Sequence, residues 1–329
     1  ANGALLLEPT ATNLIPYSED FTQWVKTGSG VAALPIITSN NSVSPDGNLN
    51  GTRLQCELNG GTTLSDVSYI KIGGISGTQF ISSKSLYIRN NLATDITLFI
   101  GINNNLDKIT IPANAVFTRY KIEGQNINTE FRIGIRGGAA NSDSIDIDIF
   151  GAQLEENSYA TSYIKTVGTA QSRVADTASD AGNSTVINSS EGVLYAEISA
   201  LNNDGTNRFI SLTDGSNDNR VLFGYRAISN QVFARIEGNN SASVDLTTVL
   251  SDTKINAKIA ISYDSSYNYK MFVNGISADS GVGTDSIIGL DRLDFTNAIG
   301  TENFYGNVKD VRVYTTALSD EELATLTTI

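Results

Sequence analysis

Short runs of alternating apolar and polar residues recur along this chain at intervals of about ten residues, separated by turn-forming residues. Because side chains on a strand repeat with period two, each run predicts a strand with one face in a core and the other in water. The runs span residues 85–89, 95–101, 117–123, 130–135 and 144–150, then 192–198, 208–212, 220–225, 231–236, 257–263, 269–273 and 307–313. A helix is predicted only over 319–326, where Ser319 and Glu322 have the spacing of a capping box. A parallel sheet would need crossover helices, so the pattern predicts an all-β chain of antiparallel sandwiches.

The length of 329 residues favours two domains, because single cores stop growing near roughly 250–300 residues. Between residues 166 and 190 the alternation gives way to small and polar residues. We therefore predict a lead-in over residues 1–10, a first sandwich over 11–165, a linker over 166–190 and a second sandwich over 191–329. Because the chain begins at Ala1 within a segment that reads as continuing, we expect a longer protein with an assembly region upstream.

Composition excludes several function classes. The chain has 22 Lys+Arg against 35 Asp+Glu, and the resulting formal charge of −13 repels phosphate backbones, so we expect no nucleic acid partner. Histidine is absent, which excludes imidazole-based hydrolases and the usual zinc enzymes. Cys56 is the only cysteine and is predicted to be a small buried hydrophobe. No apolar run approaches the roughly 20 residues of a membrane span, so membrane insertion is not expected.

Two segments of the second half carry a family resemblance. Residues 258–275 read as a strand, a turn and a second strand ending in Asn274–Gly275, a pair suited to positive φ at a hairpin turn. Residues 304–323 read as a Tyr-Gly turn, a closing strand and a short acidic helix. Together they resemble a laminin G-like domain of the concanavalin A-like lectin/glucanase superfamily. The resemblance implies a concanavalin A-like second sandwich, and such domains often carry calcium at the rim.

The first half has paired signatures at its opening and its close. Residues 6–24 and 150–176 resemble a carbohydrate-binding jelly-roll module seen in phage tail and other virion-associated proteins. The resemblance implies a jelly roll, a virion or extracellular location, and a bacteriophage tail fibre. It also implies a homotrimer; since the sequence has no coiled-coil heptads, trimerisation would come from upstream residues or sandwich edges.

Candidate sugar contacts occur in both halves. Trp24, the only tryptophan, lies near Tyr17, and sugars favour flat aromatic faces; the alternative is that Trp24 is a core residue. Arg220, Tyr225 and Arg226 fall where the concave sheet of the second sandwich would face a ligand. Arginine forks and tyrosine edges suit sulfated or uronic sugars, whereas simple surface decoration is the alternative.

Two loops of the second half are rich in oxygen donors. Calcium takes six to eight oxygens from such groups, but ordinary β-turns have the same composition. The candidate ligands of a bound Ca²⁺ are Asp204, Asn207, Asp214 and Asp218, with Asn217 and Asn219 beside them.

An acidic run in the first half invites an enzyme hypothesis. Asp146 and Asp148 are two apart on one predicted strand and therefore share a face, with Asp143 just before them. Lectin-like glucanases use acidic residues spaced along a strand, but the flanking glutamates of such enzymes are missing here. The alternative is a solvated sheet face, with Ile145, Ile147 and Ile149 pointing inward.

These observations predict a non-catalytic protein that binds carbohydrate or a cell surface, as part of a phage tail fibre or other virion appendage. The partner would be a glycan or host polysaccharide. Two alternatives stay open at this level. A polysaccharide lyase or glycoside hydrolase would use a jelly roll for chemistry, and a structural capsid or surface decoration would bind nothing specifically.

Overall fold

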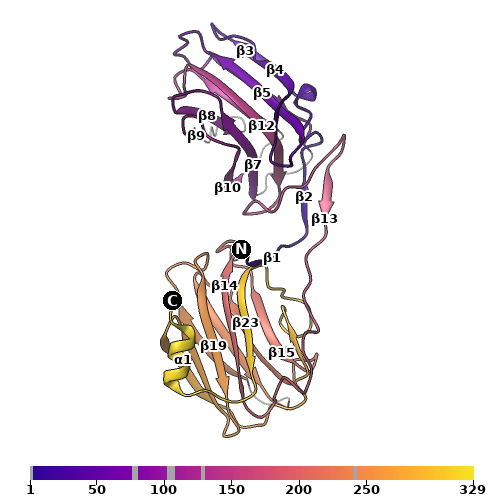
Figure 1. The fold of residues 1–329 in the computed structure, drawn as a ribbon, viewed down its shortest axis with the longest axis vertical. Helices are drawn as coiled ribbons and strands as arrows, with labels where there is room; N and C mark the ends of the chain where they lie inside the picture. The colour runs from indigo at the N-terminus through magenta and orange to yellow at the C-terminus, as the bar shows by residue number, and fades with distance from the viewer. Residues whose placement is uncertain (1–2, 76–80, 102–107, 127–129, 240–242) are drawn as a thin grey trace. The chain divides into compact units, whose positions relative to one another are not determined.

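The computed structural model describes residues 3–75, 81–101, 108–126, 130–239 and 243–329 (Figure 1). Within these ranges every pairing between strands is antiparallel, and the all-β prediction is confirmed. The described α-helix is α1 (Asp320–Thr327), which begins at the predicted Ser319–Glu322 capping box, and a short 3-10 helix spans Phe21–Gln23. Among the described residues, no helix has the length and apolar character that a membrane crossing would need.

The chain divides into two compact units whose bounds differ from the prediction. The first unit is Thr10–Val174, and the second unit combines Ala1–Pro9 with Ala175–Ile329. The first unit is therefore an insertion within the second, and the chain passes between them at two points.

The first unit contains two five-stranded sheets and a two-stranded pair. One sheet has the order β10-β7-β12-β5-β4 and the other β3-β6-β11-β8-β9, while β2 pairs with β13. Inward side chains of both sheets, among them Leu54, Ile133 and Ile147, form one buried core. The strands are β2 (Ala11–Asn13), β3 (Val25–Ser29), β4 (Ile36–Val43), β5 (Leu49–Glu57), β6 (Val67–Ile72), β7 (Ile81–Asn90), β8 (Ile96–Gly101), β9 (Lys108–Ile111), β10 (Thr118–Asn126), β11 (Phe131–Arg136), β12 (Ser144–Glu155) and β13 (Gln171–Arg173).

Cys56 of β5 lies in this core with 1% of its surface exposed, and burial raises the pKa of its thiol to about 12. The thiol therefore stays protonated near neutral pH. The prediction of a small buried hydrophobe is confirmed.

The second unit is a sandwich of a six-stranded and a five-stranded sheet. Their orders are β1-β23-β14-β19-β20-β21 and β18-β17-β16-β15-β22. The hairpin between β20 and β21 turns at Asn274 and Gly275, with φ of 50° and 84°, as predicted. The strands are β1 (Leu5–Leu7), β14 (Gly192–Ala200), β15 (Arg208–Thr213), β16 (Arg220–Tyr225), β17 (Gln231–Glu237), β18 (Val244–Val249), β19 (Ala257–Tyr263), β20 (Asn268–Val273), β21 (Ile276–Val282), β22 (Arg292–Asp294) and β23 (Gly306–Tyr314).

Alternation along β14 separates two buried clusters. Leu194 and Ala196 point into the core between the sheets, whereas Val193 and Tyr195 point to the opposite face. There they pack with Leu323 of α1, so the helix covers part of the six-stranded sheet from outside (Figure 1).

The first residues of the chain complete the second unit. β1 pairs along β23, with Leu5 opposite Val308, and Leu7 is 4% exposed within the core. The N–H of Glu8 donates to Asp176 Oδ2 and the N–H of Asp176 donates to the carbonyl of Glu8, both at 2.9 Å. The predicted lead-in is therefore wrong, and residues 175–190 of the predicted linker belong to the second unit. A three-residue strand is too short to show alternation, and its partner is distant in sequence.

We expect Leu7→Ala to lower the free energy of unfolding of the second unit by about 2–3 kcal/mol, because it removes a buried side chain and leaves a cavity. Leu5→Ala is the matched control, since Leu5 lies on the same strand and is 50% exposed. Calorimetry of both variants measures the difference. Equal melting temperatures would show that β1 is not packed on this unit.

Candidate functional site

Trp24 is a core residue of the first unit. Its ring is 3% exposed and packs against Phe21 and Phe131, with centroid distances of 5.2 and 5.7 Å. Its Nε1–H donates to the carbonyl of Tyr17 at 3.0 Å. The indole is fully engaged within the sandwich, so the prediction that it stacks on a sugar is wrong.

Tyr17 has a different environment from Trp24. Its side chain is partly exposed and lines a cavity of about 510 Å³, together with Asp20, Asn50 and Lys165. The structure thus brings Tyr17, but not Trp24, to a surface where a ligand has access.

Strand alternation separates the three residues predicted on the concave sheet. Along β16, Val221, Phe223 and Tyr225 point into the core of the second unit, whereas Arg220 points to the outer face, meaning the face turned away from that core. Tyr225 is 2% exposed, its hydroxyl donates to the carbonyl of Ile198 at 3.1 Å, and burial raises its pKa. Tyr225 is therefore a core residue, and its prediction as a ligand contact is wrong.

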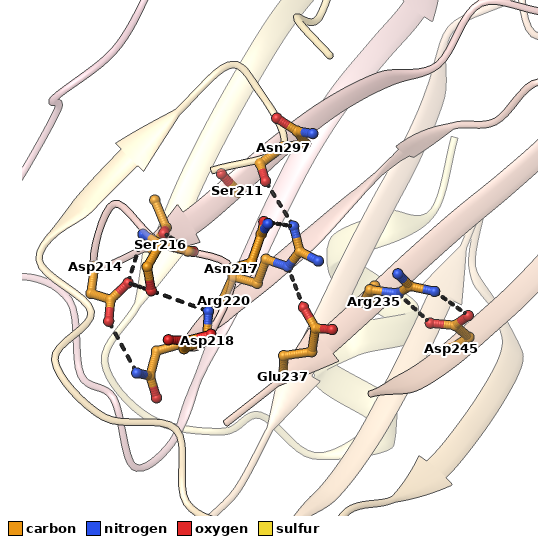
Figure 2. Close-up of polar contacts among 12 residues, drawn as sticks. Ser211, Asp214, Ser216, Asn217, Asp218, Arg220, Arg235, Glu237, Asp245 and Asn297 are labelled. Atoms are coloured by element: carbon orange, nitrogen blue, oxygen red, sulfur yellow. Dashed lines mark hydrogen bonds and ion pairs between the residues drawn. The ribbon is translucent and has the colours of Figure 1, made fainter. Parts of the chain in front are cut away.

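Arg220 lies on the outer face but is occupied by its neighbours. Its Nε donates to Glu237 Oε2 at 2.5 Å, and its Nη1 donates to Asn217 Oδ1 and, at 2.9 Å, to the carbonyl of Asn297 (Figure 2). The residue is 7% exposed. Arg220 thus holds β16, β17 and the segment around Asn297 together, and its prediction as a sugar contact is wrong.

Arg226 lies on the same outer face and is available to a ligand. It is half-buried, and its guanidinium carbon is 4.3 Å from the ring centroid of Phe233. Within the described part of the chain, this guanidinium has no ion pair and no hydrogen-bond partner. Stacking on Phe233 holds the plane of the guanidinium while leaving its N–H groups for a ligand.

Arg235 flanks Phe233 on the same strand. Its guanidinium carbon is 5.5 Å from the Phe233 centroid, and its Nε and Nη2 donate to the two carboxylate oxygens of Asp245 at 2.7 and 2.8 Å (Figure 2). The hydrogen bonds to Asp245 raise the pKa of Arg235. Nearby on β17, Gln231 has a buried Oε1 without a hydrogen-bond partner. We call Arg226, Gln231, Phe233, Arg235 and Asp245 the β17 patch.

The patch rests on a small apolar cluster. Phe233 packs with Leu222 and with Phe209, whose ring centroid is 5.8 Å away. Gly224 is paired with Phe233 in the neighbouring strand, and a Cβ there would lie 1.9 Å from the carbonyl oxygen of Arg208. Only glycine fits at this position, because any larger residue would clash with the backbone of the neighbouring strand β15.

The four predicted calcium ligands do not converge. Asp204 and Asn207 precede β15, whereas Asp214 and Asp218 follow it. A strand of six residues separates the two pairs by about 20 Å, so they cannot coordinate one ion. The structure therefore does not bring the four predicted ligands together at one ion, and calcium binding by either loop stays a prediction.

The oxygen atoms of these side chains instead accept hydrogen bonds from backbone N–H groups, as in β-turns for the two aspartates and from a neighbouring loop for Asn207. Asp204 accepts from the N–H of Thr206 at 3.2 Å, and Asp214 accepts from the N–H of Ser216 at 2.8 Å. Asn207 accepts from the N–H of Ala227 at 2.7 Å. In the described ranges, no group of three or more His, Cys, Asp or Glu side chains is arranged to hold a metal.

The acidic run of β12 is structural. Ile145, Ile147 and Ile149 point into the core as predicted. Asp148, however, is fully buried and forms an ion pair with Arg89, so this face is not simply solvated. Asp146 forms an ion pair with Arg53, whose hydrogen bond lowers the pKa of Asp146. A glycosidase acid needs a raised pKa, so Asp146 does not suit that role.

A protein-family comparison covers the second half of the chain. Residues 166–324 match the family model described as the concanavalin A-like lectin/glucanases superfamily. This part of the chain is therefore a laminin G-like domain with a concanavalin A-like sandwich, as the sequence predicted. The match does not include β1, which the structure adds to the same sheet.

Solved structures give more distant likenesses. The carbohydrate-binding module CBM40 of the Ruminococcus gnavus IT-sialidase, solved with α2,3-sialyllactose, is 17% identical, with 46% of this chain and 94% of that chain covered and a TM-score of 0.36. Mouse laminin α1 domains LG4-5 are 10% identical, with coverage of 90% and 94% and a TM-score of 0.32. Such values are too low to transfer a ligand or an activity. No curated protein matches the chain.

Proposed function

We propose that this chain is a non-catalytic carbohydrate-binding protein whose β17 patch attaches to an acidic glycan on a cell surface. The observation that carries the proposal is Arg226, a guanidinium held on the face of Phe233 with no acidic partner among the residues that the structure describes. The match of residues 166–324 to a lectin/glucanase superfamily also supports carbohydrate binding.

The chemistry of the β17 patch favours a uronate or a sulfate. A guanidinium presents a planar fork of N–H donors that matches the oxygens of such groups in two parallel hydrogen bonds. Because Arg226 is already stacked, little side-chain entropy is lost when it binds. The Oε1 of Gln231 is buried without a hydrogen-bond partner among the described residues, and a rotation of this side chain would present it to a sugar hydroxyl.

The ion pairs of the carboxylates favour carbohydrate binding without hydrolysis. The paired acids of β12 are engaged by Arg53 and Arg89, and on the β17 patch the carboxylate of Asp245 is engaged by Arg235. A hydrolase or lyase would need an acid or base free to exchange protons with the sugar.

We further propose a virion setting, on a bacteriophage tail fibre or similar appendage. Its support is the resemblance of residues 6–24 and 150–176 to modules of virion-associated proteins. In a trimeric fibre, three copies of the β17 patch would multiply a weak affinity through effective concentration.

We expect the chain to bind members of an array of uronic, sialylated and sulfated oligosaccharides, and Arg226→Ala to weaken this binding about tenfold to a hundredfold, the value of one or two charged hydrogen bonds. Arg226→Lys should recover part of the loss, since it keeps the charge without the fork. Isothermal titration with the best array ligand measures each affinity.

Lys254→Ala is the control, because Lys254 is an exposed cation of the same unit with only a 3.8 Å ion pair to Asp252. It should bind like the unaltered protein. If Arg226→Ala also binds like the unaltered protein, or no acidic glycan is bound, the proposal fails.

A further inference from the structure

We propose that the 510 Å³ cavity of the first unit is a second glycan site, and that it takes a neutral sugar. The cavity lies where β4 and β5 meet the segments 17–22 and 165–167. Its volume falls in the range of about 300–1,000 Å³ that is typical of small-ligand sites. The inference deepens the proposed function, since it adds another attachment site, but it rests on different residues in a different unit.

Two carboxylates on the wall of the cavity are held in place before any ligand arrives. Glu19 accepts from the hydroxyl of Tyr163 at 3.0 Å and from Lys165 Nζ at 2.7 Å. Asp20 Oδ1 accepts from the N–H of Thr22 at 3.1 Å and from the Thr22 hydroxyl at 2.5 Å, and Asp20 Oδ2 accepts from Gln23 Nε2 at 3.2 Å. Both oxygens of Glu19 and Oδ2 of Asp20 keep a lone pair for a further donor, and the fixed geometry lowers the entropic cost of binding hydroxyl groups.

Asn50 provides an acceptor that the protein leaves unpaired. Its Nδ2 donates to Asp46 Oδ2 at 3.1 Å, whereas its Oδ1 is buried without a hydrogen-bond partner. A buried polar atom without a partner is unfavourable by about 1–3 kcal/mol. Because this atom has no solvent-accessible surface, a rotation of the Asn50 side chain would bring it to a sugar hydroxyl in the cavity.

Tyr17 supplies the aromatic surface of the same cavity. Its ring is partly exposed, and its backbone is fixed by a bridge to Val167 and by the hydrogen bond from Trp24. C–H groups of a pyranose pack on such a face while the hydroxyls reach the polar wall. The cavity therefore combines an aromatic face, fixed carboxylates and an amide, which together suit a polyhydroxylated ring.

The charges on the cavity wall favour a neutral sugar over an acidic one. The ion pair between Lys165 and Glu19 neutralises both, whereas in the described ranges the carboxylate of Asp20 forms no ion pair. A uronate or sulfate in the cavity would meet repulsion, whereas a neutral hexose or N-acetylhexosamine would not. The first unit thus selects the opposite kind of ligand from the β17 patch.

The test uses the whole chain and four neutral probes: lactose, N-acetyllactosamine, maltotriose and chitotriose. We expect saturation-transfer NMR and titration to detect at least one of them. Ser39→Trp should weaken that binding at least tenfold, because Ser39 is exposed at the cavity wall and an indole there would fill the space.

Thr38→Trp is the matched control. Thr38 is also exposed on β4, but its side chain points to the other face of the strand, and it should leave the affinity unchanged. Tyr17→Ala gives a second route to the same loss if the tryptophan variant does not fold.

Arg226→Ala distinguishes the neutral-sugar site of the first unit from the acidic-glycan site on the β17 patch. It should leave neutral-sugar binding intact, while Ser39→Trp leaves acidic-glycan binding intact. Binding of none of the four probes, or undiminished binding by Ser39→Trp, would overturn the second site without bearing on the β17 patch.

Discussion

Replacing Trp24 with alanine should lower the free energy of unfolding of the first unit by about 3–5 kcal/mol and its melting temperature by about 6–20 °C. The indole fills the space between Phe21 and Phe131, and its loss leaves a cavity in a close-packed core. It also removes the hydrogen bond to the carbonyl of Tyr17. Calorimetry of the variant should show one transition lowered and the transition of the second unit unchanged.

Trp24→Phe is the conservative comparison. It keeps an aromatic ring in the core and loses the Nε1–H donor, so its effect should be smaller than that of alanine. A Trp24→Ala variant that melts normally but fails to bind a glycan would contradict the core assignment and restore the sugar-stacking role.

Arg220→Ala should destabilise the second unit by about 3–5 kcal/mol. Glu237 would keep a carboxylate that is mostly buried, with 17% of its side chain exposed, and lose its cation. The carbonyl of Asn297 would also lose its donor. Thermal denaturation measures the loss as a lower melting temperature of the second unit. Its transition can be told apart from that of the first unit, because Trp24, the only tryptophan, lies in the first unit and its fluorescence reports only that unit.

The double replacement Arg220→Met with Glu237→Leu is the control, because removing both charges of a buried pair is often close to neutral. It should recover most of the lost stability. If Arg220→Ala alone is as stable as the unaltered protein, the ion pair does not hold β16 and β17 together.

Alternation was sufficient to predict most of the second unit from sequence. The runs at 208–212, 220–225 and 231–236 match β15, β16 and β17 closely, because each strand is long enough to show period two. The capping box of α1 and the Asn274–Gly275 turn were predictable for a local reason, since their chemistry lies within a few residues. β1 was not, because a three-residue strand is defined only by its partner β23.

Parity along the strands explains the errors at the candidate site. Arg220 and Tyr225 are five residues apart on one strand, so they cannot share a face, and the predicted run already implied this. The predicted calcium ligands do not converge for a different reason, because Asp204 and Asp214 lie at opposite ends of the run that forms β15. Both the strand faces and this separation could be predicted from the sequence.

The β17 patch was only partly within reach of sequence analysis. Arg226 was predicted as a sugar contact, whereas Phe233 and Arg235 were missed. Phe233 and Arg235 are two apart on β17 and therefore share a face, but only the pairing of Phe233 with Gly224 brings them beside Arg226. That pairing between strands is a tertiary fact, and no local pattern encodes it.

Attachment without turnover is most directly tested by one titration in which the acidic oligosaccharide is recovered afterwards and its length and end groups are measured. We predict saturable binding that Arg226→Ala weakens at least about tenfold, with every oligosaccharide returned intact. New reducing or unsaturated ends that accumulate with time, or the same affinity in the variant, would contradict it.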